Sequence, residues 1–135
     1  MNKEGCALLQ KLCAAWRARR VVICGDGQCA APQLCAWLTI LGARPVCLPM
    51  GAPSVTLMRA LTDGRVSAVL VCCEQLPPTL AAEIREAGVP LTLLIPPASG
   101  EDGALRALAF GARFFAEGDM PCGVYDPVSG NALPE

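Results

Sequence analysis

The sequence contains no histidine, the side chain that most often serves as a general base or binds a metal near neutral pH. A surplus of either charge is also lacking, because 11 basic and 12 acidic residues leave a formal net charge of −1. Since no basic stripe runs through the chain, the composition predicts no nucleic-acid partner. Any catalysis would have to depend on Asp, Glu, Cys, Lys, Arg or the single Tyr125.

A leader sequence and a membrane span are not expected either. Residues 1–5 lead into a short apolar stretch and then into charge, without the long apolar region of a signal peptide. The longest uncharged run, residues 27–43, is of borderline length for a membrane span, but it contains Pro32, Gln33 and Gly42. We therefore expect a buried helix in this run and no membrane span in this chain.

The nine cysteines follow neither a disulfide pattern nor a zinc-site pattern. No Cys-x-x-Cys pair or Cys/His grouping with zinc-site spacing is present. Five of the cysteines lie in apolar periodic segments, where a thiol behaves as a small hydrophobic side chain: Cys13, Cys24, Cys35, Cys47 and Cys72. The sequence therefore predicts reduced thiols in a cytoplasmic protein, with no bound metal and no cofactor.

Short apolar runs alternate with helical patterns along a chain whose 135 residues fit one domain. The apolar runs predict strands at residues 21–24, 44–48, 68–72, 89–95 and 112–116. Helical spacing predicts helices at residues 4–18, 30–41, 54–62, 79–87 and 101–110, of which the second, fourth and fifth end at Gly42, Gly88 and Gly111. The remaining residues are rich in Gly and Pro and predict an irregular tail.

Strands that alternate with helices predict right-handed crossovers and a mostly parallel sheet that is covered on both faces. Five such strands most often take the flavodoxin-like order 2-1-3-4-5. We therefore predict an α/β three-layer sandwich, with residues 1–20 as an N-terminal helix, 21–118 as the α/β domain and 119–135 as a tail or linker. The functional crevice should lie at the carboxyl ends of the first and third strands, which places Gly25–Gly27 beside Cys72.

Four segments within residues 20–118 resemble the response-regulator receiver domain. VVICGDGQCAAPQLCAWLTILG is similar to the family's first strand, acidic turn and first helix, and it aligns without a gap. LMRALTDGRVSAVLVC is similar to the second helix and the strand that carries the phosphoacceptor. IREAGVPLTLLIPP resembles the third helix and fourth strand, and ALAFGARFFAEG resembles the family's Ala-Gly-Ala stretch, where a small residue lets a helix approach the fifth strand.

The resemblance also implies which chemistry this chain has lost. Receivers need an acidic pair for Mg²⁺, which favours oxygen ligands, together with an acceptor aspartate, a Thr or Ser, and a Lys. Matched position by position, only Asp26 remains, because its acidic neighbour is Gly25 and the acceptor position is Cys72. The hydroxyl position is Ile95, and the lysine position falls at or near Gly118. The resemblance therefore implies a degenerate receiver that is not phosphorylated.

The resemblance does not extend to the two ends of the chain. Receivers usually finish with a fifth helix, whereas residues 118–135 contain too many Gly and Pro residues to form one. An extra helix, at residues 4–18, precedes the first strand instead. We expect this helix to cover the sheet face that the missing helix would cover, or to pair with another chain.

The predicted helix at residues 30–41 carries no charge and is apolar nearly all round, which is typical of a buried helix or an interface helix. In receivers this helix docks onto the helices of histidine kinases or phosphotransfer domains, and the resemblance implies a retained docking face. The candidate interface residues are Cys29, Gln33, Ala36, Trp37 and Ile40. In the alternative interpretation, this surface is simply apolar or the N-terminal helix covers it.

The sequence thus predicts a non-catalytic signalling or protein-interaction domain, from a histidine kinase or a regulator of two-component signalling. Its partner would be the helices of a kinase or phosphotransfer domain, or a second copy of this chain. A competing class is a thiol-based redox sensor or small thiol-dependent enzyme that uses Cys72, Cys73 and Cys24. Asp26 and Glu74 disfavour it, because nearby negative charge opposes formation of a thiolate. A third class is a sensor that binds a nucleotide or another small molecule at the same crevice.

Overall fold

The computed structural model describes residues 3–25, 31–49, 54–62, 66–97, 100–118 and 123–133. The helices in this part of the chain are α1 (Lys3–Trp16), α2 (Ala31–Ile40), α3 (Ser54–Thr62), α4 (Pro78–Ala87) and α5 (Gly100–Glu117). The strands are β1 (Arg20–Gly25), β2 (Arg44–Leu48), β3 (Val66–Cys72), β4 (Thr92–Ile95) and β5 (Val124–Tyr125). Helices and strands alternate from α1 to β5 within these described ranges.

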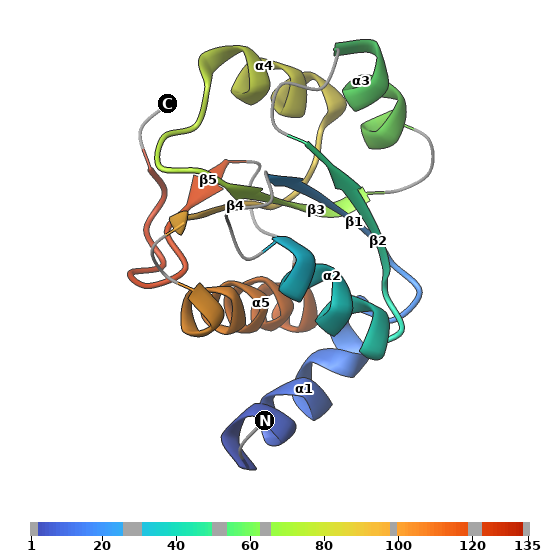
Figure 1. Cartoon of the computed structure of the whole chain (residues 1–135), viewed down its shortest axis with the longest axis vertical. Helices are drawn as coiled ribbons and strands as arrows, with labels where there is room; N and C mark the ends of the chain where they lie inside the picture. Colours follow the sequence, from blue (N-terminus) through green and yellow to red (C-terminus); the bar gives the residue numbers. More distant parts are fainter. Residues whose placement is uncertain are drawn as a thin grey trace.

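The five strands form one parallel sheet in the order β2-β1-β3-β4-β5, which confirms the predicted flavodoxin-like α/β sandwich (Figure 1). Every residue of β3 is buried, as expected for a central strand that helices cover on both faces. In the part of the chain that the structure describes, none of the helices has the length and apolarity that crossing a bilayer requires.

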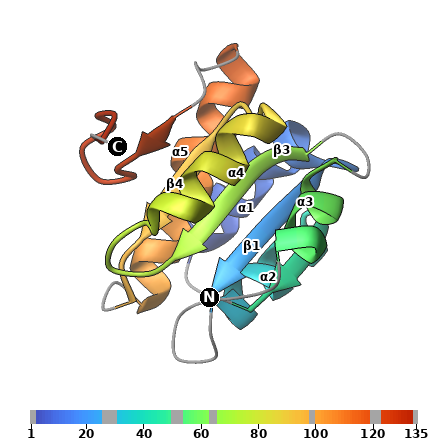
Figure 2. The same ribbon diagram turned by 90° about the horizontal axis from the view of Figure 1, so that it is seen from above.

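Successive side chains of each strand point to opposite faces of the sheet, and they build two separate cores. On one face, Ile23, Leu70 and Leu93 pack with α1, α2 and α5. On the other face, Val22 and Val71 pack with α3 and α4. Figures 1 and 2 show the same division of the helices between the two sides of the sheet. We refer to these sides as the α5 face and the α4 face.

The prediction of a strand at residues 112–116 is wrong. α5 runs without a break through Gly111 to Glu117, and the fifth strand is β5, within the segment predicted as a tail. Gly111 packs against the indole of Trp16, and a Cβ atom added to Gly111 would lie 2.5 Å from Trp16 Cζ2. This glycine is therefore required by the close approach of α1 to α5, and it does not end the helix.

The last crossover has the opposite hand to the other three. The connections through α3, α4 and α5 all step in the same direction across the sheet, yet α5 lies on the opposite face from α3 and α4. The connection through α2 steps in the reverse direction on the α5 face, so it keeps the hand of the α3 and α4 connections. Since nearly all such connections are right-handed, the prediction of right-handed crossovers is wrong for β4-α5-β5.

The packing of α5 and α1 gives a physical reason for this exception. α5 buries a stripe of small residues against the α5 face: Gly103, Ala104, Ala107, Gly111 and Ala112. Trp16 of α1 is fully buried beside this stripe and meets Phe115 edge-on, with ring centroids 6.0 Å apart. α1 therefore contributes to the core of the α5 face, and it does so mainly by packing against α5.

The described part of the predicted tail, residues 123–133, forms no helix. After β5 the chain turns, with the Gly130 amide donating a hydrogen bond to the Asp126 carbonyl at 2.7 Å. It then folds back, and the Leu133 amide donates to the Val124 carbonyl at 2.6 Å. The returning segment therefore covers the outer edge of β5, which protects an otherwise unpaired strand edge.

Candidate functional site

The carboxyl edge of the sheet brings together three of the positions singled out in the sequence. Gly25 at the end of β1 pairs in register with Cys72 at the end of β3, and Cys72 pairs with Ile95 at the end of β4. The receiver resemblance assigns these three positions to an acidic residue, the phosphoacceptor and the hydroxyl group. They lie side by side, as the strand order requires.

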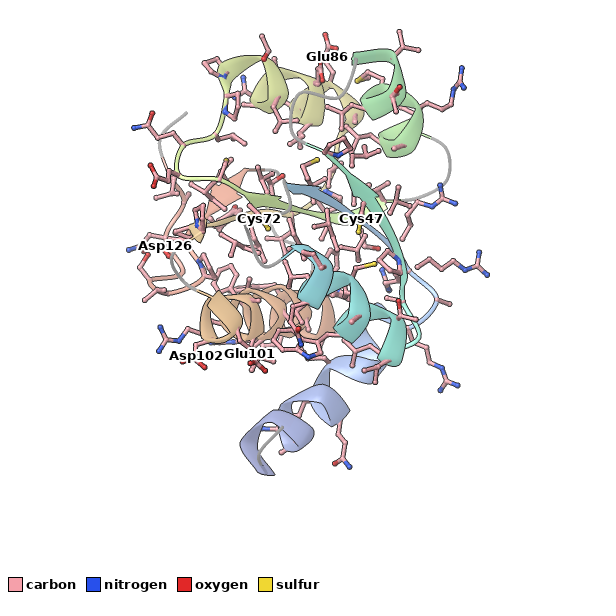
Figure 3. The ribbon with its side chains drawn as sticks, viewed as in Figure 1. Cys47, Cys72, Glu86, Glu101, Asp102 and Asp126 are labelled. Carbon is pink, nitrogen blue, oxygen red and sulfur yellow. The ribbon has the colours of Figure 1, made fainter. Side chains whose placement is uncertain are left out.

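Two of these three positions carry buried apolar side chains. Cys72 is 2% exposed and Ile95 is 1% exposed, and both belong to the core of the α5 face. In Figure 3, Cys72 lies at the level of the sheet, between the helices of its two faces. Together with Gly25, these positions supply no carboxylate, hydroxyl group or cation that could bind Mg²⁺ or a phosphoryl group.

Asp26 and Gly118 are the two remaining positions of the resemblance. Asp26 lies outside the described residues. Gly118 directly follows α5 and precedes β5, and β5 begins opposite Thr92, the first residue of β4. The connection that contains Gly118 therefore enters β5 at the amino edge of the sheet. Placing the lysine position at Gly118, at the carboxyl edge, is wrong because α5 continues through the strand predicted there.

The adjacent thiols of Cys72 and Cys73 lie on opposite faces of the sheet. Cys72 belongs to the core of the α5 face, whereas Cys73 is half-buried against the core of the α4 face. Cys24 is 3% exposed and lies in that same α4-face core. The Cys73 thiol donates a hydrogen bond to the Gln75 carbonyl oxygen at 3.1 Å. The sheet therefore separates Cys72 from Cys24, and Cys73 is the strand-end cysteine on the Cys24 side.

Burial disfavours the reactive form of two of the thiols. Burial raises the pKa of Cys24 to about 12, and the negative charge of Cys73 adds to the rise. Burial also raises the pKa of Cys47 on β2 to about 11, with a hydrogen bond to Cys35 as the next cause. Because the thiolate is both the nucleophile and the metal ligand, neither thiol is activated at neutral pH.

The outward face of α2, which also exposes Pro32 and Thr39, contains the candidate interface residues Gln33, Ala36 and Ile40. All three residues are exposed, and Ile40 keeps 67% of its surface accessible. Trp37 is 2% exposed and packs in the core of the α5 face, so it does not belong to this face. Cys29 lies outside the described residues. α1 does not cover the three exposed positions, which removes one of the alternatives for this helix.

Sequence reasoning missed a concave surface on the α4 face, next to β4 and β5. Its one signal in the sequence is Thr92, the only polar residue in the apolar run 89–95. The surface exists because of the hand of the last crossover, which hydrophobic periodicity does not reveal. No group of three or more His, Cys, Asp and Glu residues that could hold a metal ion occurs in the described ranges.

No family model and no curated protein matches this chain. Among solved structures, the chain is similar to the pyridoxal-5'-phosphate dependent protein YhfS from Escherichia coli, with a TM-score of 0.43 and 18% sequence identity. The match covers 67% of this chain and 26% of that chain, so this chain spans about a quarter of the length of YhfS. Likeness at this level has no bearing on what the protein does.

Proposed function

We propose that this protein is a non-catalytic signalling domain, similar to a receiver that has lost its phosphoacceptor, and that it acts by binding another protein. It works in the cytoplasm of a bacterium, as part of a histidine kinase or a regulator of two-component signalling. It binds its partner through the outward face of α2, which corresponds to the docking helix of receivers.

The observation that carries this proposal is that three neighbouring strand ends at the carboxyl edge lack charged and hydroxyl side chains. A phosphorylated receiver needs charged and hydroxyl side chains at the ends of neighbouring strands, because they bind Mg²⁺ and the phosphoryl group. Here Gly25, Cys72 and Ile95 occupy three such positions in register. The sheet order and α2 remain while these groups are gone, which favours a role in binding over a role in phosphoryl transfer.

The chemistry of the outward face of α2 supports an apolar helical partner. α2 carries no charged residue, and Ile40 is one of three large hydrophobic side chains that are exposed among the described residues. An exposed apolar surface is typical of an interaction site. The partner is the apolar face of a helix, from a kinase, a phosphotransfer domain or a second copy of this chain.

Thiol chemistry is the competing function, and the thiols of the described residues disfavour it. Cys24 and Cys72 are 3% and 2% exposed, so reagents and substrates have little access to them. The raised pKa of Cys24 keeps that thiol protonated at neutral pH. A binding domain is therefore the better supported of the two functions.

Replacing Ile40 with Asp tests the docking face. We expect the wild-type protein to form a reversible dimer and the variant to associate at least about tenfold more weakly, which corresponds to about 1.4 kcal/mol. The reason is that the new carboxylate would be buried in the interface without a partner. Sedimentation velocity over a wide concentration range in reducing buffer measures this change.

Val55→Asp provides a matched control, because Val55 is 70% exposed but lies on α3, on the opposite side of the sheet. We expect this variant to associate like the wild type. A dimer that Val55→Asp dissociates and Ile40→Asp does not would contradict the proposed face. If the wild type is monomeric at every concentration, the same two variants are compared for binding to an immobilised phosphotransfer domain, and equal behaviour there would contradict the proposal.

A further inference from the structure

We infer that the α4 face carries a binding site for a small apolar carboxylate, between α4 and the β4–β5 side of the sheet. An open cavity of about 520 Å³ lies at this position. Its volume falls within the range that is typical of small-molecule sites. The site is separate from the outward face of α2, which lies on the other side of the sheet, and it does not depend on the proposed function.

The cavity results from the reversed hand of the last crossover. Because α5 packs on the α5 face, none of the described helices covers β5 on the α4 face (Figure 2). Leu94 and Val124 line the cavity from the sheet, Ala81 lines it from α4, and Leu133 lines it from the returning tail. These side chains give the cavity a mainly apolar wall, which suits an apolar body of a ligand.

A smaller recess adjoins this cavity, and a threonine whose buried hydroxyl group is unsatisfied lines it. The recess has a volume of about 20 Å³, enough for one small polar group, and shares Leu76, Ala81, Arg85 and Val124 with the larger cavity. Thr92 also lines it, is 1% exposed, and its Oγ1 has no hydrogen-bond partner. A buried hydroxyl group without a partner is unfavourable, so a ligand that supplies one would gain affinity there.

The charges around the two spaces favour a carboxylate as the polar group. Among the described residues, Arg85 is the only charged one that lines the recess, whereas Glu74 lines only the larger cavity. A carboxylate can accept hydrogen bonds from both a threonine hydroxyl and a guanidinium group, and hydrogen bonds between charged groups are the stronger ones. An amine would bring a second positive charge next to Arg85. The recess therefore fits the carboxylate, and the larger cavity fits the apolar body.

Phenylacetate and octanoate are suitable probes, and phenylacetamide is the uncharged control of the same shape. We expect both carboxylates to raise the melting temperature of the full chain, because a ligand that binds only the folded state stabilises it. Isothermal titration calorimetry should show the amide binding at least about tenfold more weakly than phenylacetate. Failure of both carboxylates to bind at millimolar concentration would overturn the inference, and so would equal binding of the amide.

Thr92→Val tests the anchor, because it removes the hydroxyl group and keeps the shape of the side chain. The variant should fold, since it removes a buried hydroxyl group that has no partner, and phenylacetate should bind about tenfold more weakly. Arg85→Gln should weaken phenylacetate and leave phenylacetamide unchanged. Thr39→Val, on α2, should bind like the wild type. Unchanged phenylacetate binding in Thr92→Val, or a crystal structure with phenylacetate in which only a water contacts Thr92 Oγ1, would overturn the proposed site.

Discussion

Replacing Trp16 with Ala is expected to lower the free energy of unfolding by about 3–5 kcal/mol. The indole is fully buried between α1, α5 and the sheet, and it contacts Phe115 and the surface over Gly111. Its removal leaves a large cavity that the rigid sheet cannot fill. Because domains of this size are stable by only about 5–15 kcal/mol, the loss should be plain in urea denaturation followed by circular dichroism.

Gln10→Ala is the control for this experiment, because Gln10 lies on α1 but is exposed. An exposed substitution of this kind should change stability by no more than about 0.5 kcal/mol. If Trp16→Ala were as stable as Gln10→Ala, α1 would not belong to the core. The N-terminal helix would then be free to take the second role expected from the sequence, pairing with another chain.

Replacing Gly111 with Val is expected to destabilise the protein by about 1–3 kcal/mol through overpacking. A Cβ atom at this position would lie 2.5 Å from Trp16 Cζ2, 2.9 Å from Trp16 Cη2 and 3.1 Å from Leu91 Cδ2. The ring cannot move aside easily, because it is enclosed on every side. Val favours a helix over Gly by only about 0.5 kcal/mol. This gain does not offset the clash.

Ala116→Val, at an exposed position of the same helix, should reduce stability by only about 0.5 kcal/mol. A double-mutant cycle then assigns the effect to the contact with the ring. Gly111→Ala combined with Trp16→Phe should be less destabilising than the sum of the two single changes, because the smaller ring makes room for the new methyl group. Strict additivity would show that the indole does not restrict position 111.

The parts of the fold that depend on local pattern could be predicted from the sequence. The apolar runs that end at Cys24 and Cys72 are buried on both faces, and periodicity identifies such strands. Once the order 2-1-3-4-5 is assumed, the register of Gly25, Cys72 and Ile95 at one edge follows from it.

The parts that depend on distant contacts could not be predicted in this way. Gly111 looks like the end of a helix, and only the indole of Trp16, brought against it by folding, explains a glycine inside α5. The hand of the last crossover is likewise not visible in the local pattern, and the recess lined by Thr92 lies on the side of the sheet that this hand leaves without α5. The sequence of α2 is apolar on nearly every side of the helix. This pattern therefore does not predict that Trp37 is buried while Ile40 is exposed.

The closure of the carboxyl edge is tested most directly by alkylating the native protein and measuring the label on each cysteine by mass spectrometry. Cys47 is exposed on β2, whereas Cys72 is buried (Figure 3). Cys24 is also buried, and the pKa values of Cys24 and Cys47 are both raised, so exposure sets Cys47 apart while its protonated thiol reacts slowly. We expect Cys47 to be labelled in the folded protein, and Cys24 and Cys72 to be labelled only after unfolding. Fast and selective labelling of Cys72 in the folded protein would contradict a closed, non-catalytic edge and would favour the thiol-dependent function.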